Sequence, residues 1–188
     1  LEELAGCLAL TALRPSGRQG RVRRRFLSAV TPEGLSFCTE TAAAVCGRVY
    51  VLEDSYGLAP ALLQRVLEQA LQLGQTCLVC YTPLQPDGAP AHLLVPGAGA
   101  AFVASSPDFP YAGERCCTLE LDGTLPPAAR DTLHFARDTA GTLLRKAAEH
   151  VREAKRIHDE LEALCRPYVD FAAADALTER TLHELFPA

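Results

Sequence analysis

The sequence contains no methionine, not even at position 1, and no stretch of about 18 consecutive apolar residues. Because its first residue is not methionine, we expect the chain to be a piece of a longer protein, with residues 1–22 as a linker or the end of a preceding domain. The absence of a long apolar run argues against a membrane-spanning helix and a membrane partner. The N-terminus also lacks the basic segment and apolar core of a signal peptide.

Positive charge is scarce, since 18 Lys and Arg residues stand against 23 Asp and Glu residues and give a formal net charge of −5. This balance argues against nucleic acid as a partner. The exception is the arginine-rich segment 14–25, which has no aromatic residues to stack on bases. We interpret it as a linker that runs into a first strand. An alternative is an anion-binding segment that reaches towards the ligand of another domain.

Disulfide bonds are not required in a chain of 188 residues, which can bury a full hydrophobic core. The eight cysteines lie mostly in apolar runs, so we expect reduced, buried side chains in a cytoplasmic protein. Cys77 and Cys80 are three residues apart on a predicted strand and would therefore point to opposite faces. Two such thiols cannot share a metal ion, and we predict no metal site.

The clearest local pattern lies in residues 48–73. Residues 49–52 form a short apolar run rich in β-branched and aromatic side chains, which is typical of a buried strand. Gly57 follows in a turn, and Pro60 suits the first turn of a helix. Apolar residues then recur at helical spacing as far as residue 71. The segment predicts a strand, a tight turn and an amphipathic helix.

A strand, turn and helix of this size is where nucleotide-binding proteins carry a P-loop, G-x-x-x-x-G-K-[ST]. That pattern places its essential positions on Asp54, Ala59, Pro60 and Ala61. Asp54 would bring negative charge towards phosphates, and Pro60 removes both the lysine ammonium group and a backbone donor. Ala61 cannot ligate Mg²⁺. The residues alone therefore favour an ordinary strand–helix unit over a working phosphate site.

Several segments of the chain resemble the second domain of a largely uncharacterised bacterial family of two-domain P-loop ATPases, whose members repeat one P-loop domain twice. The matching segments are residues 26–34, 49–64, 80–88, 92–107, 154–162 and 168–171. The resemblance implies a three-layer α/β P-loop NTPase-like fold with a mostly parallel sheet. It places the core at residues 23–125 and a long-helix extension, packed on that core, at residues 126–188.

The same resemblance implies a degenerate nucleotide site. Its loop corresponds to Asp54, Ser55, Tyr56, Gly57, Pro60 and Ala61. In the family, the strand that matches residues 99–103 ends in an acidic Walker B residue, and here that position is Ala104. A metal-binding carboxylate is thus missing as well, and we predict no catalytic residue.

The C-terminal third of the sequence is predicted to be helical. Apolar residues step in threes and fours through residues 128–166, which predicts a helix of roughly 55–60 Å. We expect Thr124 to cap it, a kink near Gly141 and an end at Pro167. A final helix over residues 172–186 is expected to fold back.

Three functions are compatible with these features. The first is a non-hydrolysing, ATPase-like domain that needs no cofactor and serves as the partner or regulatory half of an N-terminal domain of the same protein, or of a homologous subunit. The second is a P-loop NTPase that binds ATP or GTP with Mg²⁺ and hydrolyses it weakly with borrowed groups. The third is a small-molecule binding module in the former nucleotide cleft, lined by Tyr56, Asp87, His92 and Ala104.

Overall fold

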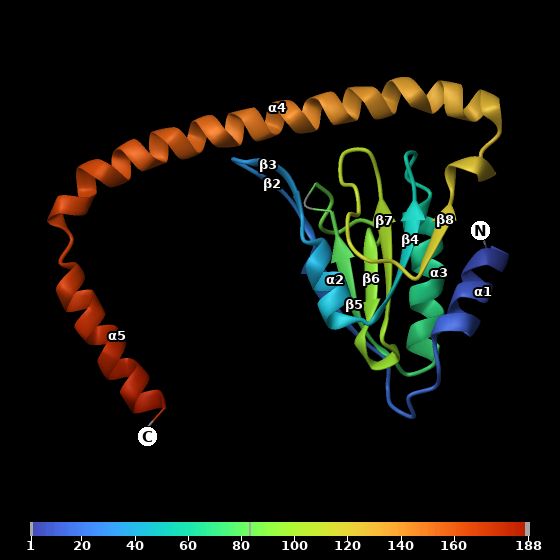
Figure 1. Cartoon of the computed structure of the whole chain (residues 1–188), viewed down its shortest axis with the longest axis horizontal. Coiled ribbons are helices and arrows are strands. Elements are labelled where there is room, and N and C mark those ends of the chain that lie inside the picture. The colour runs from blue at the N-terminus through green and yellow to red at the C-terminus, as the bar shows by residue number, and fades with distance from the viewer. Residues whose placement is uncertain (1, 83, 187–188) are drawn as a thin grey trace.

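A six-stranded sheet forms the centre of the computed structural model, which describes residues 2–82 and 84–186 (Figure 1). The strands are β1 (Arg21–Phe26), β4 (Arg48–Glu53), β5 (Thr76–Tyr81), β6 (His92–Val95), β7 (Ala100–Ser105) and β8 (Cys117–Glu120), in the order β1-β5-β6-β7-β4-β8. Strand β6 runs antiparallel to both neighbours, and the other pairs are parallel. The predicted mostly parallel sheet is confirmed, and the carboxyl ends of five strands meet at one edge.

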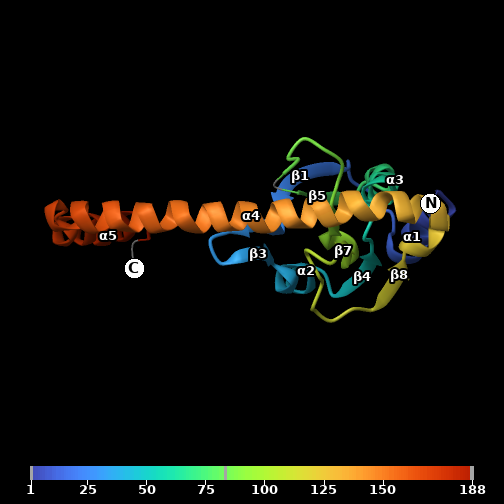
Figure 2. The same ribbon diagram turned by 90° about the horizontal axis from the view of Figure 1, so that it is seen from above.

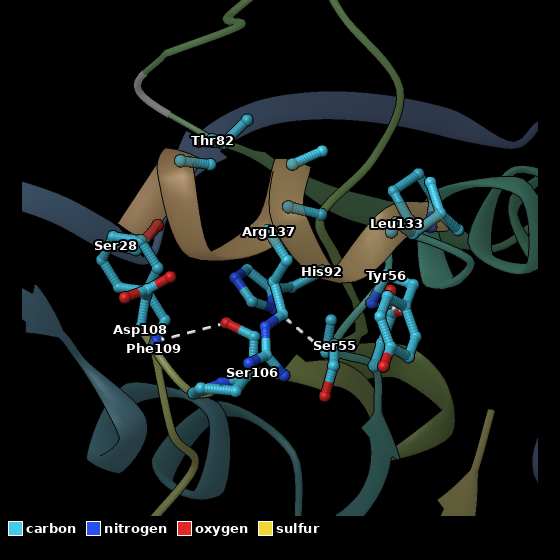
Figure 3. A pocket seen from close by; sticks show the side chains of 18 residues that line it. Ser28, Ser55, Tyr56, Thr82, His92, Ser106, Asp108, Phe109, Leu133 and Arg137 are labelled. Carbon is cyan, nitrogen blue, oxygen red and sulfur yellow. Dashed lines mark hydrogen bonds between the residues drawn. The ribbon is translucent and has the colours of Figure 1, made fainter. Parts of the chain in front are cut away.

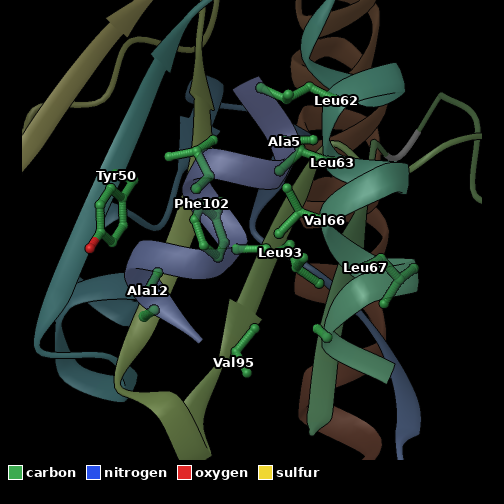
Figure 4. Packing of buried hydrophobic residues seen from close by; sticks show 14 of the residues in the cluster. Ala5, Ala12, Tyr50, Leu62, Leu63, Val66, Leu67, Leu93, Val95 and Phe102 are labelled. Carbon is green, nitrogen blue, oxygen red and sulfur yellow. The ribbon is translucent and has the colours of Figure 1, made fainter. Parts of the chain in front are cut away.

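Helices cover both faces of the sheet, so the core has three layers. Helix α3 (Ala59–Gln72) and helix α1 (Glu2–Ala12) lie on one face (Figure 4). Leu62, Leu63 and Val66 of α3 are fully buried there, in contact with the cluster that contains Phe102 of β7. The opposite face is covered by the short helix α2 (Thr39–Val45). The strand, turn and helix predicted over residues 48–73 are confirmed.

Helix α1 belongs to this core. Ala5, Ala9 and Ala12 are almost completely buried, and α1 packs along α3. The segment after α1 is also fixed, since the backbone N–H of Ser16 donates to the carbonyl oxygen of Leu73 at 2.9 Å. The structure therefore places residues 2–13 in the domain rather than in the linker that we expected.

The end of the arginine-rich segment, together with Phe26, forms β1, an edge strand whose six residues are all exposed. Within the segment 14–25, the strand thus begins at residue 21. A separate hairpin follows, made of β2 (Ser28–Thr31) and β3 (Gly34–Phe37). Strand β1 ends at Phe26 and β2 begins at Ser28, so the chain changes sheet between them. The hairpin turns between Thr31 and Gly34, which are paired across it.

Helix α4 (Pro127–Cys165) is 39 residues long and runs across the carboxyl edge of the sheet (Figures 1 and 2). It continues through Gly141 without the expected interruption. A Cβ atom at Gly141 would lie 2.9 Å from Oδ1 of Asp108, so this glycine allows the loop after β7 to approach the helix. Thr124 does not cap α4. Its hydroxyl donates to the carbonyl oxygen of Leu121 at 2.7 Å, and Pro126 occupies the cap position.

The extension packs on the core only over its first part. Ala148 is buried, and Nε of Arg152 donates to the carbonyl oxygen of Pro32 at 2.9 Å. From residue 149 to residue 186 every described residue is exposed. Helix α5 (Phe171–Leu185) begins with Asp170, whose side chain accepts the N–H of Ala173, and it does not return to the sheet (Figure 1). We call residues 149–186 the arm.

None of the described helices is both long and apolar enough to cross a membrane.

Candidate functional site

A cavity of about 400 Å³ lies at the carboxyl edge of the sheet, beneath helix α4 (Figure 3). Its walls are the turn after β4, the start of β6 and the loop after β7, and α4 forms its roof. Ligands of open α/β sheets bind at this edge because loops from several strands converge there. The cavity is therefore the candidate functional site.

Most of the site residues expected from the sequence line this cavity. They are Asp54, Ser55, Tyr56, Gly57, Pro60, His92 and Ala104. Two expected residues do not line it. Ala61 is exposed on the first turn of α3. Asp87 lies in the exposed loop after β5, where Oδ1 is 3.0 Å from Nη1 of Arg24, so its assignment to the cleft was wrong.

The turn after β4 is closed by the side chain of Asp54, which is 7 % exposed. Its Oδ1 accepts the backbone N–H groups of Tyr56 at 3.2 Å and of Leu58 at 2.9 Å. Its Oδ2 accepts the N–H of Ala59 at 2.7 Å. These amides lie at the start of α3, where the unpaired N–H groups of a helix attract an anion. The carboxylate of Asp54 therefore occupies backbone N–H groups that could otherwise attract an external anion.

A second carboxylate binds the same turn. The N–H of Ser55 donates to Oδ1 of Asp122 at 2.8 Å. Asp122 belongs to the short 3₁₀ helix that follows β8, so a distant part of the chain also contributes to the turn. Four backbone donors of residues 55–59 are thus satisfied by two acidic side chains of the protein itself.

Ala104 lies on β7 beside Leu52 of β4, and its backbone N–H donates to Nδ1 of His92 at 3.2 Å. No carboxylate occupies this side-chain position, as the sequence indicated. His92 is 4 % exposed, and its ring stacks on Phe37 with the ring centroids 4.9 Å apart. Burial lowers the pKa of His92 to about 4, so the ring is neutral near pH 7.

Helix α4 contributes the basic side chain of the cavity, Arg137. Its Nη2 lies 2.6 Å from Oδ1 of Asp138, and this hydrogen bond raises the pKa of Arg137. Asp108 enters from the loop after β7, and its Oδ1 is 3.4 Å from Nη1 of Arg145. Each of these charged groups already has a partner of opposite sign on the protein.

The described residues include one group that could hold a metal ion, formed by His158, Asp159 and Glu162 on the arm. All three side chains are exposed, and Nζ of Lys155 is 2.7 Å from Oδ2 of Asp159. This geometry is an ordinary set of ion pairs on a helix surface.

The cysteines follow the expectation in part. Cys77 and Cys80 are buried in the clusters on opposite faces of the sheet, which confirms that they cannot share a metal. Of the eight free cysteines, five are exposed rather than buried.

Sequence reasoning missed the residues that α4 and the β7 loop bring to the cavity. Among them are Arg137, Leu133, Asp108 and Phe109. Helical spacing could have placed Leu133 and Arg137 near one side of α4, since they are four residues apart. Nothing in the spacing indicates that this helix crosses the sheet edge.

No family model, curated protein or solved structure matches this chain.

Proposed function

We propose that this chain is a non-hydrolysing, P-loop-like domain that serves as the partner or regulatory half of a two-domain ATPase-like protein. The observation that carries the proposal is the placement of the Asp54 carboxylate on the amides of Tyr56, Leu58 and Ala59. A triphosphate would have to displace this carboxylate from three hydrogen bonds. It would also enter a turn that already holds two negative charges.

Other groups at the turn support the same conclusion. A P-loop supplies a lysine for the β- and γ-phosphates and a hydroxyl for Mg²⁺, and residues 60 and 61 are proline and alanine. The charged residues that line the cavity are Asp54, Asp108 and Arg137, with a net formal charge of −1. This balance disfavours a polyphosphate. We therefore infer that neither ATP nor Mg²⁺ is a cofactor of this domain.

The arm supports a role in binding another protein. Its exposed apolar side chains include Ile157, Leu161 and Leu164 on α4 and Leu177, Leu182 and Leu185 on α5, each more than half exposed. They recur at helical spacing, and a helix with one apolar face is stabilised by packing that face against another surface. We propose that the partner is the N-terminal domain implied by the resemblance, or a homologous subunit in the cytoplasm.

The proposal that the domain does not use ATP is tested by titrating the protein with a fluorescent ATP analogue in the presence and absence of Mg²⁺. We expect no saturable binding. Mg²⁺-dependent binding in the micromolar range would contradict the proposal and favour the alternative of a weakly hydrolysing NTPase. Substituting Asp54 by Asn serves as the matched variant, because it removes the negative charge and keeps the side-chain size.

The proposed role as a partner or regulatory half is tested with an active P-loop domain of the resembling family. We expect sedimentation analysis to detect a complex and the ATPase rate of that domain to change when this chain is added. The double substitution Leu161→Glu and Leu164→Glu should abolish both effects, whereas Glu160→Gln, on the same exposed helix, should not. An unchanged rate together with no complex would contradict a regulatory role.

A further inference from the structure

His92 presents a hydrogen-bond donor to the cavity. Because the N–H of Ala104 can only donate, Nδ1 of the neutral ring must be unprotonated, and the proton resides on Nε2. Nε2 has no hydrogen-bond partner among the described residues. It is also not enclosed by protein atoms, because Arg130 Nε is the one enclosed and unpaired side-chain polar atom of residues 2–82 and 84–186. Among the described residues this N–H thus has no acceptor, so it is available to a water molecule or a ligand.

The surroundings of this donor are largely apolar. Tyr56, Phe109 and Leu133 line the cavity around His92 (Figure 3), and Ala136 and Ala140 of α4 close it from above. Phe109 is held in place, since its N–H donates to Oγ of Ser106 at 3.2 Å. Aromatic and aliphatic side chains at such positions favour a flat apolar body.

The charge of the cavity restricts the ligand further. Asp54 and Asp108 both line it, against one cation, Arg137, which is already paired with Asp138. An anionic ligand would meet an excess of negative charge. A cationic ligand would meet carboxylates that already accept hydrogen bonds from backbone amides or from Arg145. An uncharged molecule avoids both the repulsion that an anion would meet and the competition for carboxylates that a cation would meet.

We propose that the cavity binds a small, uncharged, planar heteroaromatic molecule whose carbonyl oxygen accepts the Nε2–H of His92. Purine-type or pyridine-type bases without phosphate groups have this chemistry. The volume of about 400 Å³ lies within the range of small-molecule sites. The inference goes beyond the partner role and does not depend on it, because it uses the Nε2–H of His92 and not the amides of the turn.

Hypoxanthine and purine provide a matched pair of probes, since they share a ring system and only hypoxanthine carries the carbonyl group. Calorimetric titration of the whole chain is expected to give a dissociation constant for hypoxanthine on the order of 1 mM or tighter. Purine should bind about five- to tenfold more weakly, because the His92 donor is then left unpaired.

Substitutions on α4 keep the test independent of core stability. Ala140→Phe places a ring in the cavity from an exposed helix position and should abolish hypoxanthine binding. Ala128→Phe makes the same change at an exposed position outside the cavity and should leave binding unchanged. No binding of hypoxanthine, equal binding of purine, or undiminished binding by Ala140→Phe would overturn the proposal. A negative result with hypoxanthine does not change the outcome of the ATP titration, so the two proposals are tested separately.

Discussion

Replacing Asp54 by alanine should destabilise the domain strongly, because the turn depends on its carboxylate. The side chain is 7 % exposed and accepts three backbone N–H groups at 2.7–3.2 Å. Hydrogen bonds to a charged group contribute about 1.5–3 kcal/mol each, and water entering the open cavity would replace part of that. A loss of about 2–4 kcal/mol in the free energy of unfolding is expected.

Thermal unfolding followed by circular dichroism measures this effect. For a domain of this size the loss corresponds to a decrease in Tm of about 5–15 °C. Asp54→Asn should lie between the wild type and Asp54→Ala, since the amide oxygen can still accept the N–H groups of Tyr56 and Leu58. Its NH₂ group cannot accept the N–H of Ala59.

Asp87→Ala is the matched control, because Asp87 forms an exposed ion pair with Arg24. Such pairs contribute less than about 1 kcal/mol, so the Tm should change little. If Asp54→Ala and Asp87→Ala unfold at the same temperature, the carboxylate does not hold the turn, and the structural basis of the proposed function is refuted.

Three further results are expected. Gly74→Ala should destabilise the protein by more than Gly99→Ala. Both glycines have positive φ, but only at Gly74 would a Cβ atom lie 2.0 Å from a backbone oxygen. Urea denaturation measures the two losses of stability, and equal losses would contradict this prediction. Burial raises the pKa of Cys77 and Cys80 to about 12, so iodoacetamide should modify only the exposed cysteines of the native protein at pH 8. Mass spectrometry measures the modification, and finding Cys77 or Cys80 modified would refute the prediction. Because the pKa of His92 is lowered from 6.5 to about 4, its contribution to stability is complete above pH 6.5 and falls by about 3 kcal/mol as the pH decreases to 4. Denaturation curves measured across this pH range should show the fall for the wild type and not for a His92→Gln variant.

The local elements of the core could be predicted from the sequence because their signals are local. The apolar run 49–52, the glycine at residue 57 and the helical spacing after Pro60 each specify their own geometry. The buried strand at residues 76–81 was likewise recognisable from its continuous apolar character. The absence of a lysine at residue 60 and of a hydroxyl at residue 61 could also be recognised from the sequence.

The features that could not be predicted depend on contacts between residues far apart in the chain, which the spacing of residues in the sequence does not reveal. The sequence indicated that Asp54 would repel phosphate, but not that its carboxylate turns back onto the amides of its own loop. Gly141 suggested a kink, whereas its missing side chain makes room for Asp108, which is 33 positions away in the chain. The arginine-rich segment 14–25 was interpreted as a linker that runs into a first strand, and the strand begins earlier than expected because an exposed edge strand tolerates charged residues.

The carboxylate of Asp54 occupies amides after β4, and we propose that it closes them to a nucleotide. The most direct test is an NMR titration of ¹⁵N-labelled protein with Mg²⁺-ATP, in which the amide signals of Tyr56, Leu58 and Ala59 are followed. We expect these three signals to remain in place at millimolar nucleotide. Saturable shifts of all three at micromolar ATP would show that phosphate displaces the carboxylate and that the turn is open to a nucleotide.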